Sequence, residues 1–187
     1  MFRYDVASLV DSLKIVDALT VGEILHAEGV YASVHSARVQ AQKALNSLAD
    51  LGKLEKGKGY YRTLDCKSEY AEHARLLTKS LAELFKTKAE PVIFREHSIS
   101  EVALRPDALV LLKREGQGLC FVLEICHTET PEYLNQKITT WRNWDNALGF
   151  LSGLFKCNVP HFEIVVVGDE VPGGCWEFNR FIKEVVK

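Results

Sequence analysis

Arg105-Pro106-Asp107-Ala108-Leu109-Val110-Leu111-Leu112 is followed, after a glycine-containing turn at 116–118, by Leu119-Cys120-Phe121-Val122-Leu123-Glu124-Ile125-Cys126. Nearly continuous apolar runs of this length are typical of strands that are covered on both faces of a sheet. The short turn between the two runs predicts that they pair as a hairpin. We therefore expect these two strands to form the centre of a buried sheet.

The surrounding sequence predicts the rest of an α/β domain over residues 91–187. Residues 92–95 form a further predicted strand, and a long amphipathic helix is expected from Pro131, at a first-turn position, to about Phe155. Residues 162–167 are another apolar strand, and residues 176–186 are a predicted closing helix. Strands, a helix and a further strand in this order favour an α/β sandwich with a mixed sheet.

Two carboxylates interrupt these apolar strands. Asp107 begins one strand and Glu124 lies near the end of the next, so pairing of the two strands brings the residues together. A buried carboxylate is costly unless it is paired, hydrogen-bonded or bound to a cation, and paired oxygen ligands suit Mg²⁺. Lys137 falls inside the apolar stripe of the following helix, where it either extends to the edge or pairs with Glu124.

The N-terminal third is predicted to begin with two helices. Apolar residues at helical spacing over residues 5–13 indicate a first helix that ends before Thr20. Thr20 and Glu23 match a capping box, which places the start of a second helix at Val21 and its end near Ala27.

A third helix is expected from the N-cap Ser33 to about Leu51, where Gly52 stops it. Steps of 100° per residue separate a buried face from an exposed one. The predicted buried face comprises Val34, Ala37, Ala41, Ala44, Leu48 and Leu51. The predicted exposed face comprises His35, Arg38, Val39, Gln42, Lys43 and Asn46, several of which can hydrogen-bond to base edges. Residues 53–62 form two short segments of alternating side chains, the second rich in aromatics, with a turn at Gly57 to Gly59 between them. This pattern indicates a β-hairpin with lysines at its tip.

Charge is distributed unevenly although the net charge is only −2. Residues 1–35 hold two basic and five acidic residues, whereas residues 36–62 hold six basic and two acidic ones. One basic segment in a mildly acidic chain is what we expect if a single surface faces a polyanion.

Residues 66–90 are predicted to form a connecting helix, from Glu69 to about Phe85. Its predicted buried side is Tyr70, Ala74, Leu77, Leu81, Leu84 and Phe85. His73 lies within that stripe and is expected to be a core residue, because no second His or Cys stands at metal-ligand spacing.

Composition excludes several classes of protein. No apolar run approaches the length of a membrane helix, and residues 1–5 lack a signal-peptide pattern, so we expect a soluble, cytoplasmic protein without a membrane partner. Five cysteines without a C-x-x-C pair indicate neither a disulfide framework nor a cysteine zinc site. Glycine-rich phosphate loops and the common hydrolase and zinc-protease motifs are also absent from the sequence.

Three helices followed by a basic hairpin resemble the winged helix-turn-helix domain, here over residues 1–65. The stretch from Ala44 to Lys56 is similar to the junction between recognition helix and wing in that superfamily. This resemblance implies binding of double-stranded DNA, with the third helix in the major groove and the hairpin on phosphates. The implied DNA-contacting residues are His35, Arg38, Gln42, Lys43, Asn46, Lys56, Lys58 and Arg62.

Arg105-Pro106-Asp107 with Glu124-Ile125-Cys126 resembles the core of the PD-(D/E)XK nuclease-like fold. In that fold an Asp and a Glu bind the metal ion, and a Lys two positions after the Glu assists the attacking water. The chain is also similar to the replication-relaxation family of plasmids and integrative elements. The similarity lies in the order of a winged helix, a helix with a His, R-P-D-A, a strand ending in residues 123–130 and then Leu134 to Lys137. That family is implied to act in plasmid replication and DNA relaxation.

Cys126 stands where the nuclease pattern has Lys, and a thiol neither carries that fixed charge nor binds Mg²⁺ as a hard ligand. The leading hypothesis is a DNA-binding protein of a mobile element whose nuclease-like domain has lost cleavage, and Mg²⁺ is expected as a cofactor only if the nuclease-like site is active. The first alternative is an active Mg²⁺-dependent endonuclease in which Asp107 and Glu124 bind the metal and Lys137 replaces the missing lysine. The second alternative is a protein-docking module or a homodimer platform, because winged helices often read paired half-sites.

Overall fold

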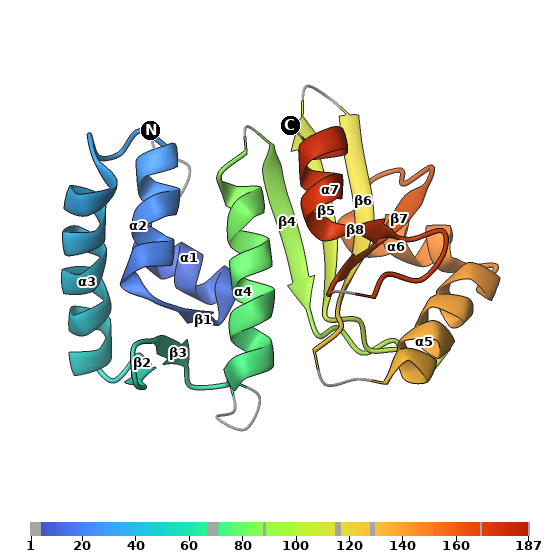
Figure 1. The fold of residues 1–187 in the computed structure, drawn as a ribbon, viewed down its shortest axis with the longest axis horizontal. Coiled ribbons are helices and arrows are strands. Elements are labelled where there is room, and N and C mark those ends of the chain that lie inside the picture. Colours follow the sequence, from blue (N-terminus) through green and yellow to red (C-terminus); the bar gives the residue numbers. More distant parts are fainter. Residues whose placement is uncertain are drawn as a thin grey trace. The chain divides into compact units, whose positions relative to one another are not determined.

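The computed structural model describes residues 5–66, 71–87, 89–114, 117–127, 130–168 and 170–186. The chain divides into an N-terminal unit, Met1–Lys86, and a C-terminal unit, Thr87–Lys187. Both units mix helices with strands, as Figure 1 shows, so the α/β class predicted from the sequence is confirmed. No helix in the described ranges is long and apolar enough to cross a membrane.

The N-terminal unit contains four helices and three short strands among its described residues. They follow one another as α1 (Val6–Leu13), β1 (Ile15–Val16), α2 (Ala18–Ala27), α3 (Val34–Asp50), β2 (Leu54–Lys56), β3 (Tyr61–Thr63) and α4 (Ala71–Phe85). The strands form an antiparallel sheet in the order β1-β3-β2. Strand β1 was not predicted, because two buried apolar residues at the end of a helix carry no period of their own.

Helix α2 begins earlier than the sequence analysis predicted. Its N-cap is Asp17, whose side chain accepts a hydrogen bond from the Thr20 amide at 2.8 Å. The predicted capping box of Thr20 and Glu23 is therefore wrong, since an Asp three residues upstream satisfies the same terminus. Glu23 instead forms an ion pair with Lys86, Oε2 to Nζ, at 2.6 Å.

Helix α3 follows the prediction closely at both ends. Ser33 is its N-cap and accepts from the Ser36 amide, and Gly52 adopts a positive φ of 69° just beyond the last turn. The fully buried residues are Ala37, Ala41 and Leu45, whereas Leu51 is 68% exposed. The buried face is thus rotated toward Leu45 relative to the predicted one.

Helices α2 and α3 pack closely because of one glycine. A Cβ atom at Gly22 of α2 would lie 2.7 Å from the backbone nitrogen of Arg38 in α3. Only glycine permits this approach, which fixes α3 on α2 and thereby places the outward side of α3.

Helix α4, at the position of the expected connecting helix, belongs to the N-terminal unit. All five described residues of the predicted buried side, Ala74 to Phe85, are buried, while Tyr70 and Glu69 lie outside the described residues. His73 is half-buried. The Thr78 hydroxyl donates to the Leu13 carbonyl at 2.9 Å, which ties α4 to the end of α1.

The C-terminal unit is built around a five-stranded mixed sheet. Its elements are β4 (Glu90–Arg95), β5 (Ala108–Arg114), β6 (Gln117–Ile125), α5 (Pro131–Asn143), α6 (Ala147–Phe155), β7 (Phe162–Val167), β8 (Trp176–Glu177), α7 (Phe178–Phe181) and a π-helical turn (Ile182–Val186). Strands β4, β5 and β6 are antiparallel, whereas β6, β7 and β8 are parallel to one another. The mixed sheet predicted from the sequence is confirmed.

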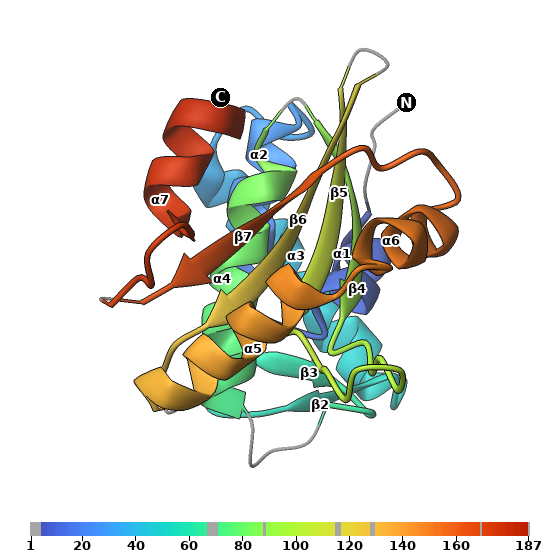
Figure 2. The same ribbon diagram turned by 90° about the vertical axis from the view of Figure 1, so that its right-hand side faces the viewer.

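Helices cover both faces of this sheet (Figure 2). One face packs against α5 and α6 in a core that includes Leu109, Val122, Ile138 and Leu151. On the other face the ring of Phe121 meets Phe181 of α7 at 5.0 Å between centroids. Because helices cover both faces of the sheet, its strands appear in the sequence as continuous apolar runs.

Two predictions for this unit were wrong in detail. The long helix expected from Pro131 to Phe155 is two helices, because Trp144 has an extended backbone with φ −85° and ψ 100°. The expected closing helix over 176–186 begins only at Phe178, since Trp176 and Glu177 add β8 to the edge of the sheet.

Candidate functional site

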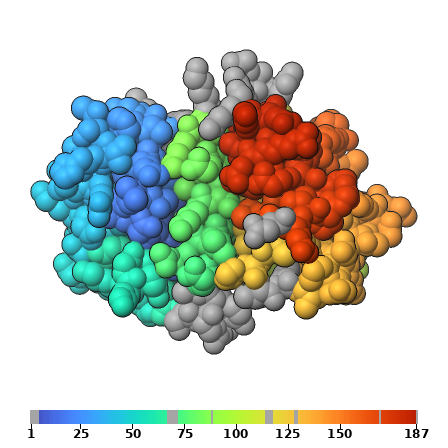
Figure 3. All heavy atoms as spheres, in the orientation of Figure 1, coloured from blue at the N-terminus to red at the C-terminus, as the bar shows by residue number. Residues whose placement is uncertain are grey.

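One exposed surface of the N-terminal unit, which we call its outward surface, is formed by α3 and the hairpin of β2 and β3. Figure 3 shows α3, in light blue, and the hairpin, in turquoise, along one continuous edge of this unit. His35, Arg38 and Lys43 of α3 are exposed, as is Lys58 in the turn of the hairpin. These four predicted DNA contacts are therefore accessible to a partner.

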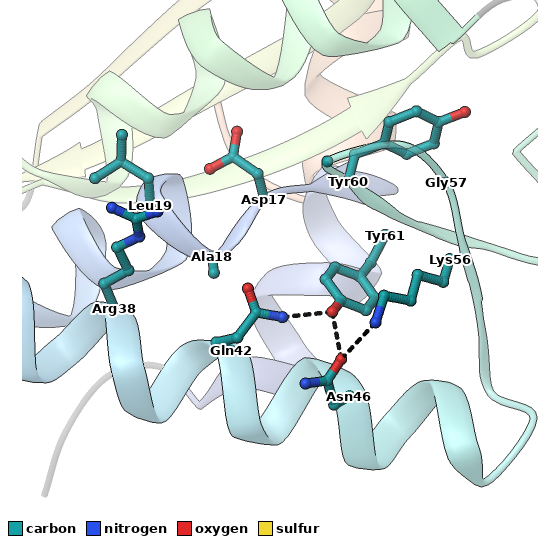
Figure 4. Close-up of a pocket in the computed structure, with 11 residues that line it drawn as sticks. Asp17, Ala18, Leu19, Arg38, Gln42, Asn46, Lys56, Gly57, Tyr60 and Tyr61 are labelled. Atoms are coloured by element: carbon teal, nitrogen blue, oxygen red, sulfur yellow. Dashed lines mark hydrogen bonds between the residues drawn. The ribbon is translucent and has the colours of Figure 1, made fainter.

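Three other predicted contacts form a hydrogen-bonded cluster with Tyr61 (Figure 4). The Gln42 amide donates to the Tyr61 hydroxyl at 2.5 Å, and that hydroxyl donates to Asn46 Oδ1 at 2.5 Å. Lys56 Nζ donates to the same Asn46 oxygen at 3.1 Å and lies 5.7 Å from the centre of the Tyr61 ring. The cluster fixes the hairpin against α3 and orients the side chains that line the space between them.

Arg62 is engaged within the hairpin. Its guanidinium forms an ion pair with Glu55 on the neighbouring strand and donates to the Cys66 carbonyl at 2.5 Å. Its side chain is only 17% exposed. This geometry gives Arg62 a role in holding the hairpin, so the basic charge of the outward surface comes from the other cations.

A groove of about 580 Å³ lies between the start of α2, α3 and the hairpin. Figure 4 shows Arg38 and Leu19 at one side of it and Lys56 with Tyr61 at the other. Its lining consists of Asp17, Ala18, Leu19, Arg38, Gln42, Asn46, Lys56, Gly57, Gly59, Tyr60 and Tyr61.

Five lining residues with side chains were missed by sequence reasoning: Asp17, Ala18, Leu19, Tyr60 and Tyr61. Tyr61 has a detectable signal, since its β-strand position opposite Lys56 turns it toward α3. The ring of Tyr60 packs over Gly57, where an added Cβ would lie 2.2 Å from the ring. Asp17 and Leu19 carry no such signal, because they become part of the groove only through the packing of α2 on α3.

In the C-terminal unit Asp107 and Glu124 come together as predicted. The β5–β6 register pairs Ala108 with Leu123, so Asp107 stands opposite Glu124. Residues that stand opposite one another in an antiparallel pair share a face, and this is the face of Leu109 and Val122 that packs on α5. Asp107 Oδ2 accepts a hydrogen bond from the Ile125 amide at 2.6 Å.

Lys137 of α5 completes this site. Its Nζ lies 2.5 Å from Glu124 Oε2, and the two side chains are 6% and 0% exposed. Of the two possibilities that the sequence left open, Lys137 therefore pairs with Glu124 and does not extend to the edge. The ring of Tyr133, one helical turn earlier, lies 5.7 Å from the ammonium group.

Mg²⁺ binds through near-octahedral oxygen ligands. One oxygen of each carboxylate has a partner within the protein, because Oε2 of Glu124 receives an ammonium and Oδ2 of Asp107 receives an amide. Within the described part of the chain, no group of three or more His, Cys, Asp or Glu residues is placed to hold a metal ion. Cys126 is half-buried beside Gly168 at the ends of β6 and β7.

Comparison with known proteins finds no relative of this chain. The chain matches no protein-family model, no curated protein and no solved structure.

Proposed function

We propose that the N-terminal unit is a winged helix-turn-helix domain that binds double-stranded DNA. The element order α1-β1-α2-α3-β2-β3 and the antiparallel order β1-β3-β2 support this fold assignment. In such a domain α3 is the recognition helix and the β2–β3 hairpin is the wing.

The observation that carries the proposal is the accessible positive charge of these two elements. Arg38 and Lys43 on α3, and Lys56 and Lys58 on the hairpin, are all exposed, while Arg62 neutralises the nearby Glu55. Phosphate groups are bound by cations of this kind, and His35 and Gln42 add side chains that recognise base edges. We therefore assign phosphate contacts to the four cations and base contacts to His35 and Gln42.

Salt dependence of binding tests this assignment. Four phosphate contacts give a slope of about −3.6 in log K against log salt, which is a loss of roughly a hundredfold in affinity between about 50 and 200 mM salt. Fluorescence anisotropy with labelled duplexes measures it. Lys58→Ala should reduce the slope by about 0.9, whereas Lys183→Ala, an exposed lysine of the C-terminal unit, is the matched control. Absence of binding at micromolar protein, or an unchanged slope in Lys58→Ala, would refute the proposal.

We further propose that the C-terminal unit has a PD-(D/E)XK nuclease-like fold that does not cleave DNA. The hairpin carrying Asp107 and Glu124 beside a parallel β7 supports the fold, and Cys126 at the position of the pattern's lysine supports the loss of cleavage. Supercoiled plasmid should remain intact with Mg²⁺ or Mn²⁺. Nicking that disappears in Asp107→Ala would instead establish the metal-dependent endonuclease.

The resemblance to the replication-relaxation family suggests where such DNA binding acts. We propose a role in the replication or DNA relaxation of a plasmid or integrative element. Replacing the protein by its Arg38→Ala variant in such an element should change its copy number, and an unchanged copy number would argue against this role.

A further inference from the structure

The groove beside α3 is large enough to hold a small ligand. Its volume of about 580 Å³ is within the range of small-ligand sites, roughly 300–1,000 Å³. A recognition helix meets the edges of stacked base pairs with its outward surface, whereas a hollow beside the helix accepts a group that projects from its partner.

The floor of the groove offers an acceptor and a donor in fixed positions. Gln42 uses its Nε2 group on Tyr61, and Figure 4 shows its carbonyl oxygen turned toward Ala18. Asn46 uses its Oδ1 atom for both Tyr61 and Lys56, so its amide Nδ2 group is not needed by either bond. Paired donors and acceptors of side-chain amides match the hydrogen-bonding edge of a nucleobase.

The walls of the groove supply contacts for the two other parts of a nucleotide, the flat face of the base and the phosphate. Leu19 is a large apolar side chain that is 45% exposed at the groove, where it can cover the flat face of a base. Arg38 lies beside Leu19, and Lys56 lies on the opposite side (Figure 4), so a cation is available for phosphate at either end. An arginine can also stack on a base.

We propose that this groove binds a single unpaired nucleotide, with its base edge on Gln42 and Asn46, its base face against Leu19 and its phosphate on Lys56 or Arg38. The inference deepens the proposed DNA binding and rests on it where the nucleotide belongs to a DNA strand. The same chemistry is offered by a free nucleotide, so the experiment distinguishes the two sources.

Two duplexes of the same length and flanking sequence provide the first measurement, one fully paired and one with a single-nucleotide bulge. Fluorescence anisotropy should show about tenfold tighter binding of the bulged duplex, the gain expected from one well-placed base contact. Leu19→Ala and Gln42→Leu should bring the ratio close to one. Leu51→Ala removes an exposed leucine that does not line the groove and should keep the preference. Thermal melts confirm that each variant is folded.

Calorimetry with deoxynucleoside 5′-monophosphates provides the second measurement. Binding of a free nucleotide that Leu19→Ala weakens supports the site, and without a bulge preference it identifies the free nucleotide as the source. Equal binding of both duplexes with no binding of free nucleotides overturns the inference and leaves duplex binding intact. Nucleotide binding without any DNA binding supports the groove and refutes the proposed function. Binding of neither refutes both.

Discussion

Replacement of Lys137 by Met should destabilise the C-terminal unit strongly. The substitution keeps the length of the side chain but leaves the Glu124 carboxylate, which is fully buried, without the ammonium 2.5 Å away. Breaking a buried ion pair by removing one partner costs about 3–5 kcal/mol. For a unit of about 100 residues this corresponds to a decrease of roughly 15–30 °C in melting temperature.

Tryptophan fluorescence reports this unit selectively, because all three tryptophans, Trp141, Trp144 and Trp176, lie in it. Urea unfolding followed by this signal gives the free energy of unfolding for each variant. The pair Glu124→Leu and Lys137→Met, combined in one chain, replaces both charges by apolar groups. The double variant should be nearly as stable as the original chain, since the cost of the single changes is mainly the buried charge left behind.

The double-mutant cycle measures the interaction between Glu124 and Lys137. A coupling free energy of about 2 kcal/mol or more is expected for two groups in direct contact. If Lys137→Met costs less than about 1 kcal/mol, or if the effects of the two changes simply add, the ion pair does not hold this part of the core and the reasoning is refuted.

Four further predictions concern single residues. Asp17→Ala should cost the N-terminal unit about 1 kcal/mol in urea unfolding, and Thr20→Ala much less; equal effects would contradict the observed cap. Gly22→Ala should cost about 1–3 kcal/mol, because the new Cβ would lie 2.7 Å from the Arg38 backbone, and an unchanged stability would show that α2 and α3 separate freely. Burial, with a smaller effect of Cys157, raises the pKa of Cys120 to about 12, so roughly one molecule in 10⁴ carries the thiolate near pH 8. Iodoacetamide followed by peptide mass spectrometry should label Cys120 last, and early labelling would contradict this burial. Burial lowers the pKa of Lys86, but hydrogen bonds to Glu23 and Glu83 outweigh it, and the net pKa is above the ordinary 10.5. Stability from Lys86 is therefore fully present below about pH 10.5 and is lost as the pH rises further, so Lys86→Met should be destabilising at neutral pH and not in strong alkali.

The positions of β5, β6 and β7 could be predicted because burial on both faces leaves a clear apolar run, whereas the two residues of β8 carry no such run. The break between α5 and α6 could not, since both helices contribute to the same core and the apolar spacing continues across it. Leu134 and Ile138 of α5 pack there together with Leu151 of α6. Periodicity detects which side of a helix is buried, but it does not detect a residue such as Trp144 whose backbone is extended.

The sequence predicted more of the Asp107 and Glu124 site than of the groove beside α3. Asp107 and Glu124 lie opposite one another because a hairpin register follows from counting residues on both sides of a short turn. The cluster of Gln42 and Asn46 with Tyr61 joins residues 19 and 15 positions apart across a helix and a strand. No local pattern encodes that contact, so the sequence placed Gln42 and Asn46 on one exposed helix face but did not join them to Tyr61 of the hairpin.

The positive charge beside Glu124 has a structural cause that is independent of cleavage. In the nuclease pattern the lysine stands two residues after the glutamate, and on a strand such a residue points to the same face. Cys126 occupies that position and packs against the same core, so the charge has to come from another element. Lys137 supplies it from α5. A fully buried carboxylate requires such a partner whether or not it takes part in catalysis. Burial alone therefore accounts for Lys137, and the DNA binding proposed for the N-terminal unit depends on no chemistry at Glu124.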